Sequence, residues 1–335
     1  MYIKTYSKFN RGLIFILNPV SLLYKSLSFL VLKKRSLKKK NYDNAYIISI
    51  DNLSFGGTGK TALVIAIGKY LSQKKIKFAI ITRGYRSRSE QKGALVTAQN
   101  TVDEVGDEAI LLKRNFPDQD IYVGKNRHKS LKQARSRNNK IMLLDDGFQS
   151  TSIPKNLKIM LINPHHPYYY LRHFKCLMRG EDIILRYHPE SGSALKSNHR
   201  LSVQHSLPME ASYSFIPEGF YNPQHQSLEI NDASIMGFSA LGDNIRFQTD
   251  LSAFNLKAFK AYRDHFHFTQ KDIKQLDRLR QNSKATYLVC TEKDFIKLAH
   301  LDLAGIPLIY IKNRLQLSVD VLSVIYNHAK KQGFI

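Results

Sequence analysis

Apolar positions along this chain of 335 residues fall in short runs that alternate with amphipathic stretches. Short apolar runs bounded by turn residues predict buried strands, and apolar positions that recur every three or four residues predict helices. Strands are predicted in the first half at residues 45–50, 78–82, 94–96, 121–123, 141–144 and 157–162. Helices are predicted from residue 62 onward and over residues 109–113 and 127–137. This alternation indicates an α/β fold with a doubly wound parallel sheet of the P-loop NTPase type.

The pattern changes twice in the second half. Aromatic, histidine and turn residues dominate residues 164–226, so we expect an insertion with short, irregular strands there. Strands are predicted again at residues 233–239, 286–290 and 307–311, and helices at residues 253–262 and 319–331. We therefore expect an N-terminal segment (residues 1–40), a domain that contains the insertion (residues 41–228) and a second, smaller α/β domain (residues 229–335).

The N-terminal segment is mostly apolar over residues 12–32, and six of the eight residues from Lys33 to Lys40 are basic. No small-residue cleavage site follows the apolar run, which argues against a secretory signal peptide. Pro19 and Lys25 make a membrane-spanning helix costly. An apolar helix followed by a basic cluster is typical of a peripheral anchor on an anionic membrane surface. A buried packing helix and a single N-terminal span are the alternatives.

The charge of the chain favours anionic partners. Its 51 Lys and Arg residues against 27 Asp and Glu residues give a net charge of +24. Such a field attracts nucleic acid, anionic membranes or phosphorylated substrates. No basic motif with interleaved aromatic residues is present, so we do not expect a nucleic-acid partner, and no obligate protein partner is evident. The two cysteines, Cys176 and Cys290, are too few for a disulfide framework, which fits a reducing cytoplasm.

A glycine-rich loop follows the strand predicted at residues 45–50, and a helix follows the loop. Strand, glycine loop, Lys-Thr and helix form the context that a phosphate-binding P-loop requires. Lys60 is expected to reach the outer phosphates of a nucleotide, and the Thr61 hydroxyl is expected to hold Mg²⁺. Ser54 stands where the general pattern has a glycine. The predicted nucleotide-binding residues are Ser54, Phe55, Gly56, Gly57, Thr58, Gly59, Lys60 and Thr61.

Acidic residues follow at the places where a nucleotide-dependent enzyme needs them. Asp145 and Asp146 come after the apolar strand at residues 141–144 and are predicted to hold Mg²⁺, although Asp-Asp-Gly is also common turn chemistry. Asp107 and Glu108 follow a turn glycine near the edge where a parallel sheet binds ligands, and simple helix-terminal acids are the alternative. His265, beside Asp264, is a candidate base or substrate-orienting residue, with a surface histidine as the alternative.

Taken in order, these motifs resemble the tetraacyldisaccharide 4′-kinase family, the lipid A kinase of Gram-negative bacteria. The resemblance extends from about Asn18 to Leu298. The family carries Ser or Thr at the position of Ser54, so this departure supports the resemblance. The matching segments include Asn52 to Thr61, Thr82-Arg83-Gly84-Tyr85, Val105-Gly106-Asp107-Glu108, Asn126-Arg127, Leu144-Asp145-Asp146-Gly147-Phe148-Gln149, Phe238-Ser239-Ala240-Leu241-Gly242-Asp243, Asp264-His265 and Thr291-Glu292-Lys293-Asp294.

The resemblance implies that the γ-phosphate of ATP is transferred, with Mg²⁺, to the 4′-hydroxyl of the tetraacyldisaccharide 1-phosphate precursor of lipid A. The enzyme would act peripherally at the cytoplasmic face of the inner membrane. Asp107, paired with His265 from the second domain, would be the base, and Lys60 would bind the phosphates. The metal would be held by Thr61, Glu108, Asp145 and Asp146. The substrate would be contacted by Arg83, Tyr85 and Arg127.

Two alternatives remain open from the sequence. Residues 163–182 contain only fragments of the family's Leu-Pro-x-Gly-x-Leu-Arg-Glu segment, so a paralogous kinase of another membrane glycolipid is one alternative. Thr291-x-Lys293-Asp294 is reminiscent of a guanine-reading motif, so a P-loop GTPase or switch without kinase activity is the other.

Overall fold

The computed structural model describes residues 42, 44–52, 59–147, 150–162, 182–188, 208–317 and 321–335. The predicted membrane anchor and most of the segment at residues 163–182 lie outside these ranges. So do five of the predicted nucleotide-binding residues, which are Ser54, Phe55, Gly56, Gly57 and Thr58. Within the described ranges, no helix has the length and apolar character needed to cross a membrane.

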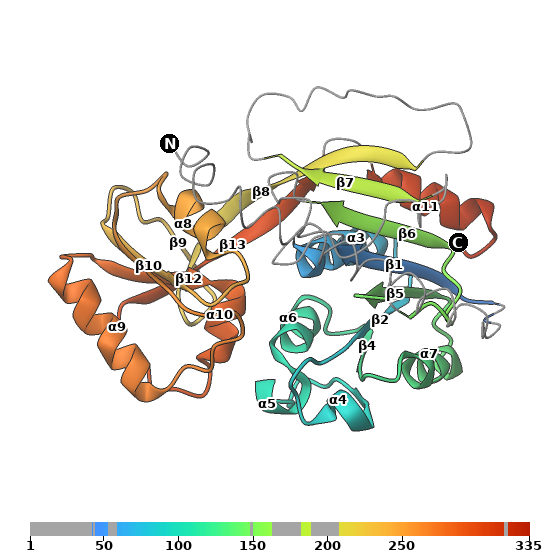
Figure 1. Ribbon diagram of the computed structural model, residues 1–335, viewed down its shortest axis with the longest axis horizontal. Helices are drawn as coiled ribbons and strands as arrows, with labels where there is room; N and C mark the ends of the chain where they lie inside the picture. Colours follow the sequence, from blue (N-terminus) through green and yellow to red (C-terminus); the bar gives the residue numbers. More distant parts are fainter. Residues whose placement is uncertain are drawn as a thin grey trace, which may run out of the picture.

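Every strand in the described part of the chain joins one 13-stranded sheet. The first seven strands are β1 (Tyr46–Asn52), β2 (Phe78–Thr82), β3 (Ala94–Leu95), β4 (Asp120–Val123), β5 (Ile141–Asp145), β6 (Leu157–Ile162) and β7 (Ile183–Tyr187). The others are β8 (Met209–Tyr221), β9 (Ser227–Leu228), β10 (Ile235–Ser239), β11 (Leu256–Ala261), β12 (Tyr287–Thr291) and β13 (Leu308–Leu317). Their order is β11-β10-β12-β13-β8-β7-β6-β1-β5-β2-β4-β3, and β9 pairs with β8 (Figure 1).

The helices cover both faces of the parallel part of this sheet. They are α3 (Lys60–Gln73), α4 (Ser89–Lys92), α5 (Val102–Val105), α6 (Asp107–Asn115), α7 (Arg127–Ser136), α8 (Asn244–Leu251), α9 (Gln270–Asn282), α10 (Glu292–Lys297) and α11 (Val321–Lys331). Ile48 of β1 packs in the core under α3 and α6, whereas Ile47 packs with Leu131 of α7 on the other face. Because neighbouring strand residues point to opposite faces, a strand covered on both sides is apolar throughout. The predicted doubly wound parallel α/β fold is confirmed.

Two long strands, β8 and β13, connect two groups of elements that lie apart in Figure 1. We call residues 44–188 the first unit and residues 229–306 the second unit. β8 pairs with β13 in antiparallel register and with β7 in parallel register. The short, irregular strands expected over residues 164–226 are therefore wrong for β7 and β8, which are regular strands of the main sheet. Burial along β8 follows no strict alternation, and its partner β13 comes far later in the chain, so the apolar pattern did not reveal it.

The second unit is a smaller α/β arrangement in which β10, β11 and β12 are parallel and α8, α9 and α10 pack around them. The helix predicted over residues 253–262 is wrong, because residues 256–261 form the strand β11. Leu, Ala and Lys favour helices, but pairing with β10 at the sheet edge overrides that preference. Lysines such as Lys257 and Lys260 are common on edge strands, where they discourage further pairing.

The chain returns to the first unit at its end. Val321, Ile325 and Ala329 of α11 are buried in the same core as the inner face of α3. The Tyr46 hydroxyl is hydrogen-bonded to His328 Nδ1, which ties β1 to this helix. The domain boundary at residue 228 stays a prediction, and α11 packs on the unit that contains the P-loop lysine.

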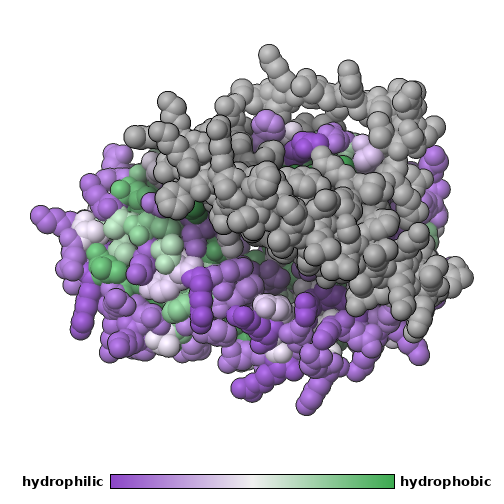
Figure 2. Space-filling view, viewed as in Figure 1, coloured by the Kyte–Doolittle hydropathy of each residue, from purple (hydrophilic) through white to green (hydrophobic). Residues whose placement is uncertain are grey.

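The described surface in Figure 2 is largely hydrophilic around the first unit, and apolar surface gathers on the second unit. Ile245 of α8 is 49% exposed and is one of three large apolar side chains exposed among the described residues.

We expect Ile325→Ala to destabilise the protein by about 2–4 kcal/mol, because it removes a side chain that is 2% exposed and leaves a cavity between α11 and α3. Val324→Ala on the same helix is the matched control: Val324 is 40% exposed, and its loss should change stability by less than about 0.5 kcal/mol. Urea unfolding of both variants measures the difference. Equal effects would contradict the packing of α11 described above.

Candidate active site

The predicted P-loop ends at the N-terminus of α3. Gly59 precedes the helix with φ of 90°, and a side chain there would collide with the ring of Phe215 on β8. Only glycine fits both conditions. Lys60, the first residue of α3, donates a hydrogen bond from Nζ to Asn52 Oδ1 at 3.2 Å, and Nζ lies 3.9 Å from Asp146 Oδ1. The unpaired N–H groups at the start of such a helix favour anions, so Lys60 lies beside a site suited to phosphate.

Asp145 ends β5, the strand that pairs with β1. Its side chain is buried, and Oδ2 accepts a hydrogen bond from Thr82 Oγ1 at 3.1 Å. Oδ1 is also buried and has no hydrogen-bond partner among the described residues. Burial, followed by the nearby carboxylate of Glu108, raises the pKa of Asp145 to about 7. A buried carboxylate oxygen with no donor is poorly satisfied by the protein alone and suits a cation.

Asp107 and Glu108 form the first turn of α6, after Gly106 with φ of 93°. Asp107 Oδ1 accepts a hydrogen bond from the backbone N–H of Glu108 at 2.9 Å. Acidic side chains are stabilised at a helix N-terminus by the exposed N–H groups of the first turn. Asp107 is nevertheless only 7% exposed, so its charge needs further partners.

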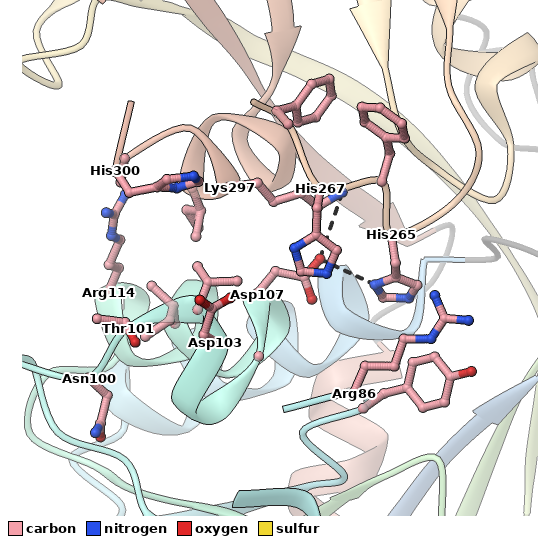
Figure 3. Close-up of a pocket in the computed structure, with 18 residues that line it drawn as sticks. Arg86, Asn100, Thr101, Asp103, Asp107, Arg114, His265, His267, Lys297 and His300 are labelled. Atoms are coloured by element: carbon pink, nitrogen blue, oxygen red, sulfur yellow. Dashed lines mark ion pairs between the residues drawn. The ribbon is translucent and has the colours of Figure 1, made fainter. Parts of the chain in front are cut away.

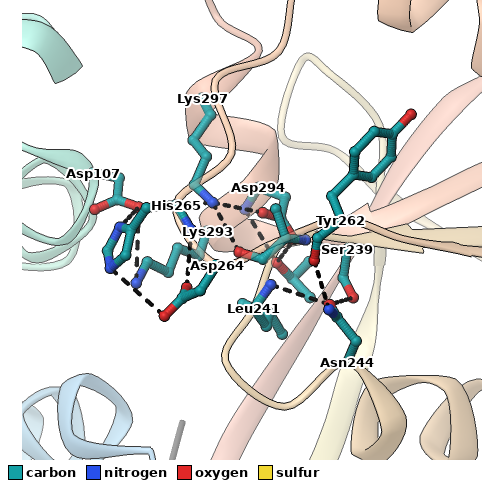
Figure 4. A network of polar contacts seen from close by, with 12 residues as sticks. Asp107, Ser239, Leu241, Asn244, Tyr262, Asp264, His265, Lys293, Asp294 and Lys297 are labelled. Carbon is teal, nitrogen blue, oxygen red and sulfur yellow. Dashed lines mark hydrogen bonds and ion pairs between the residues drawn. The ribbon is translucent and has the colours of Figure 1, made fainter. Parts of the chain in front are cut away.

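Three side chains of the second unit supply these partners. From Asp107 Oδ2, His265 Nδ1 lies at 3.4 Å and the Nζ atoms of Lys293 and Lys297 lie at 3.8 Å (Figure 4). Burial acts to raise the pKa of Asp107, but Lys293, His265 and Lys297 together outweigh it and hold that pKa well below its usual range. Asp107 is therefore ionised at neutral pH.

His265 lies on the loop between β11 and α9, where its backbone has φ of 56°. Its Nε2 is 3.9 Å from Asp264 Oδ2, and its ring centroid is 5.6 Å from that of Tyr85 in the first unit. The guanidinium groups of Arg83 and Arg86 lie 5.4 Å and 5.2 Å from the Tyr85 ring centroid. The structure thus brings Asp107 and His265 together from separate units, with Tyr85 beside them.

A cavity of about 380 Å³ opens beside Asp107, between the start of α6 and the loop that carries His265 (Figure 3). Apolar residues of α5 and α6, such as Val102 and Ile110, form part of its wall. Basic side chains form another part, among them Arg86, Arg114, His267, Lys297 and His300. The volume and mixed lining are those of a small-molecule site.

The two arginines predicted to contact substrate occupy different environments. Arg83 is half-exposed and its Nε forms an ion pair with Glu90 Oε1 at 2.7 Å. Arg127 is buried, and its two terminal nitrogens donate to the backbone carbonyls of Gly124 and Asp145, each at 3.0 Å. Arg127 therefore supports the end of β5 through the backbone of Asp145.

Lys293 and Lys297 are site residues whose roles the sequence did not predict. The segment around them resembles a guanine-reading motif, but Asp294 is fully buried. Asp294 Oδ2 accepts hydrogen bonds from Thr291 Oγ1 at 2.8 Å and from the backbone N–H of Ala240 at 3.1 Å. Because this carboxylate is buried and accepts hydrogen bonds from its own unit, it is not placed to bind a guanine base. The signal in the sequence is the spacing of Lys293 and Lys297, which lie one helical turn apart and therefore on one face of a helix.

The donor set fits Mg²⁺ bound together with phosphate. Within the described ranges, no group of three or more His, Cys, Asp and Glu side chains is arranged to enclose a metal ion. Mg²⁺, however, is commonly held by one or two carboxylates together with water and phosphate oxygens. Asp145 offers a buried oxygen without a donor, Asp146 follows it at the strand end, and Glu108 is close enough to shift the pKa of Asp145. Thr61, in the first turn of α3, completes the set of predicted ligands.

These features define a P-loop kinase: a doubly wound sheet, a Gly-Lys-Thr entry to α3 and carboxylates at the ends of neighbouring elements. The chain matches the tetraacyldisaccharide-1-P 4′-kinase family, LpxK, over residues 13–330. The protein belongs to this family and is a kinase of lipid A biosynthesis.

Relatives and a solved structure agree with this assignment. The tetraacyldisaccharide 4′-kinase of Desulfotalea psychrophila is 28% identical over 327 residues, which cover 90% of this chain and 92% of that protein. The enzyme of the same name from Helicobacter acinonychis is 29% identical over 333 residues, covering 98% of this chain and 93% of that protein. The crystal structure of LpxK from Aquifex aeolicus in complex with ATP superposes with a TM-score of 0.68 at 22% identity, covering 93% of this chain and 98% of that one.

We expect Asp145→Asn to stabilise the nucleotide-free protein at about pH 8. The pKa of this carboxyl rises from 3.8 to about 7 on folding, so the folded state binds more protons than the unfolded state between these values. The protonated Asp145 carboxyl therefore favours the folded state fully below about pH 4, and this stabilisation is lost as the pH rises through about 7. In thermal melts the variant should unfold several degrees above the wild type near pH 8, and the difference should vanish near pH 4.

Asp118→Asn, in the exposed turn after α6, is the control and should melt like the wild type at both pH values. If Asp145→Asn melts at or below the wild-type temperature near pH 8, the unfavourable ionisation of Asp145 is refuted.

Proposed function

We propose that this kinase transfers the γ-phosphate of ATP to the 4′-hydroxyl of tetraacyldisaccharide 1-phosphate, with Asp107 as the base and Mg²⁺ at the carboxylates of the first unit. One observation carries the proposal: Asp107 Oδ2 lies 3.4 Å from His265 Nδ1, across the two units and beside a cavity large enough for a substrate group. The remaining roles follow from the positions of the other side chains around this pair.

The nucleotide is proposed to bind at the P-loop, residues 54–61. Lys60 would donate to the β- and γ-phosphates, and the N-terminus of α3 would add its N–H groups. Support comes from the hydrogen bond between Lys60 and Asn52, the last residue of β1, and from the likeness of the fold to LpxK from Aquifex aeolicus, whose crystal structure was solved in complex with ATP.

Thr61, Glu108, Asp145 and Asp146 are proposed to hold Mg²⁺. When bound there, the ion would neutralise charge that develops on the transferred phosphoryl group. Glu108 and Asp145 already interact electrostatically in the protein, because the Glu108 carboxylate acts to raise the pKa of Asp145. The negative charges of Glu108 and Asp145 repel each other, and a bound Mg²⁺ ion would relieve this repulsion.

Asp107 is proposed to accept the proton of the 4′-hydroxyl as its oxygen attacks the γ-phosphorus. The O–H bond breaks, the O–P bond forms, and ADP leaves with the electrons of the former P–O bond. Asp107 is suitable because it is ionised at neutral pH. Among the described residues, no donor forms a hydrogen bond to its Oδ2 atom, which is therefore available to a hydroxyl group. His265 would hold the carboxylate in place and share the proton that it receives.

The acceptor is proposed to lie in the cavity beside Asp107, with Tyr85 against its sugar and Arg83 near its anionic groups. Arg83 is half-exposed and is therefore the more accessible of the two predicted arginines. Arg127 would act on the site by supporting the end of β5. The family name specifies four acyl chains on a disaccharide, so the rest of the acceptor is embedded in lipid.

We further propose that the enzyme docks peripherally on the cytoplasmic face of the inner membrane through residues 12–40. This segment combines an apolar stretch with a basic cluster, and the whole chain carries a net charge of +24. Apolar burial and attraction to anionic lipids would together hold the protein where its acceptor is found.

Asp107→Asn and His265→Ala should each lower kcat by about a hundredfold to ten-thousandfold, because a positioned base contributes about that much. The affinity for ATP should stay within a few-fold, since neither side chain is proposed to bind the nucleotide. The assay follows bisphosphate formation in mixed micelles that contain ATP, Mg²⁺ and the disaccharide 1-phosphate.

Asp118→Asn should retain wild-type turnover in the same assay. Full turnover in both site variants would remove the two-unit base from the mechanism. Wild-type protein that hydrolyses GTP and yields no bisphosphate would overturn the proposed reaction itself.

Replacing the six basic residues between Lys33 and Lys40 by Gln should weaken membrane binding. Each Lys or Arg near an anionic surface contributes about 1 kcal/mol, so we expect binding to phosphatidylglycerol vesicles to fall by about a hundredfold or more. Vesicle sedimentation at low salt measures this. As a control, replacing the exposed Lys271, Lys274 and Arg278 of α9 by Gln should have little effect. Equal binding by the two proteins would refute the basic segment as the anchor.

A further inference from the structure

Lys293 extends from α10 of the second unit to Asp107 and Glu108 at the start of α6, and Figure 4 shows it beside Asp107. Its Nζ donates a hydrogen bond to Glu108 Oε1 at 2.9 Å and lies 3.8 Å from Asp107 Oδ2. Its side chain is 18% exposed, so it is largely withdrawn from water. An ammonium group in such a place is retained by the carboxylates that it faces.

Lys297, one helical turn later, is held in a different way. Its Nζ donates to the carbonyl oxygen of Ala240 at 3.1 Å and to Asp294 Oδ1 at 2.8 Å, both within the second unit. It also lies 3.8 Å from Asp107 Oδ2. Lys297 is therefore anchored at its own end of the interface, whereas the hydrogen bond from Lys293 to Glu108 crosses to the first unit. If Glu108 binds another group, Lys293 therefore loses its hydrogen bond to Glu108, whereas the hydrogen bonds of Lys297 are unchanged.

Glu108 stands at the point where such a change is expected. Its carboxylate interacts electrostatically first with Lys293 and also with Lys60, the P-loop lysine. It interacts with Asp145 at the end of β5 as well. Lys293 thus approaches from the second unit the same group of charges that Lys60 approaches from the first.

We propose that Lys293 binds the γ-phosphate of the nucleotide from the side of the second unit, and that Glu108 holds Lys293 in position until the nucleotide arrives. The proposal rests on the function proposed above, in which Glu108 becomes a metal ligand. Once Glu108 turns to a cation, its attraction for Lys293 weakens, and the γ-phosphate is the anion newly present. Lys293 has three N–H donors, so it can bind a phosphate oxygen and remain near Asp107.

A contact between Lys293 and the γ-phosphate would stabilise the transition state of the transfer. During phosphoryl transfer, negative charge is spread over the three equatorial oxygens of the γ-phosphoryl group. Lys60 would reach these oxygens from the start of α3, and Lys293 would reach them from the unit that also supplies His265. A cation contributed by a second element to the transferred group is an effective way of stabilising that charge.

The test compares nucleotides with and without a γ-phosphate. Titration calorimetry with Mg²⁺ measures the affinity of wild-type protein and Lys293→Met for AMP-PNP and for ADP. We expect Lys293→Met to weaken AMP-PNP binding about tenfold or more and ADP binding less than about threefold. Lys293→Arg keeps the charge and should recover most of the AMP-PNP affinity. Lys271→Met, at an exposed position of α9, should match the wild type with both nucleotides.

A second pair of variants allows for the case in which Lys293→Met leaves Glu108 unpaired and unfolds the protein. In EDTA, where Glu108 has no metal to bind, Glu108→Gln should raise AMP-PNP affinity several-fold by releasing Lys293. The double variant Glu108→Gln/Lys293→Met removes both partners of the Lys293–Glu108 hydrogen bond and should lose that gain. Equal losses for AMP-PNP and ADP in Lys293→Met, or an equal gain in both Glu108 variants, would overturn the proposal.

These titrations contain no acceptor, so they are independent of the proposed lipid substrate. If the wild-type protein forms no bisphosphate but Lys293→Met weakens the binding of AMP-PNP more than that of ADP, the acceptor is refuted and the role of Lys293 is kept. If the wild-type protein forms the bisphosphate but Lys293→Met weakens AMP-PNP and ADP binding equally, the kinase reaction is kept and Lys293 is refuted as a phosphate-binding residue.

Discussion

Two carboxylates at the start of α6 face three cationic or protonatable side chains from the second unit, and the active-site arrangement depends on this set of charges. Asp107 is buried, and a buried carboxylate without partners is strongly destabilising. His265, Lys293 and Lys297 satisfy it only where the second unit lies against the first turn of α6. The same three groups also keep Asp107 ionised, so the contact that completes the site prepares its proposed base.

The sheet explains how these distant residues come together. β1 and β5 lie side by side and end at Asn52 and Asp145, because parallel strands bring their carboxyl ends to one edge, and Lys60 Nζ donates a hydrogen bond to Asn52 there. β8 and β13 form an antiparallel pair that continues the same sheet into the second unit. The second unit is therefore attached through a backbone ladder rather than a loose linker. This connection sets where α10 and the His265 loop lie relative to α6.

Much of the first unit was predictable because its signals are local. A buried strand followed by Gly-Lys-Thr, and another followed by Asp-Asp, can each be recognised within about ten residues of sequence. β8 and β11 were not recognised, since their stability comes from strands that are distant in the chain or from pairing at an edge. The pairing of Asp107 with His265 followed from the family resemblance, because no spacing in one sequence brings a loop of the second unit to the first turn of α6. Lys293 lies in a segment that resembles the family and Lys297 follows one turn later, but neither position indicated its contact with Asp107, which belongs to another unit.

The central claim is that Asp107 and His265 act as one catalytic unit, and a double-mutant cycle on kcat tests it most directly. In the bisphosphate assay, Asp107→Asn/His265→Ala should be about as slow as the slower of the two single variants, because the second change has nothing left to remove. If the two losses multiply in the double variant, Asp107 and His265 act independently and the account is contradicted.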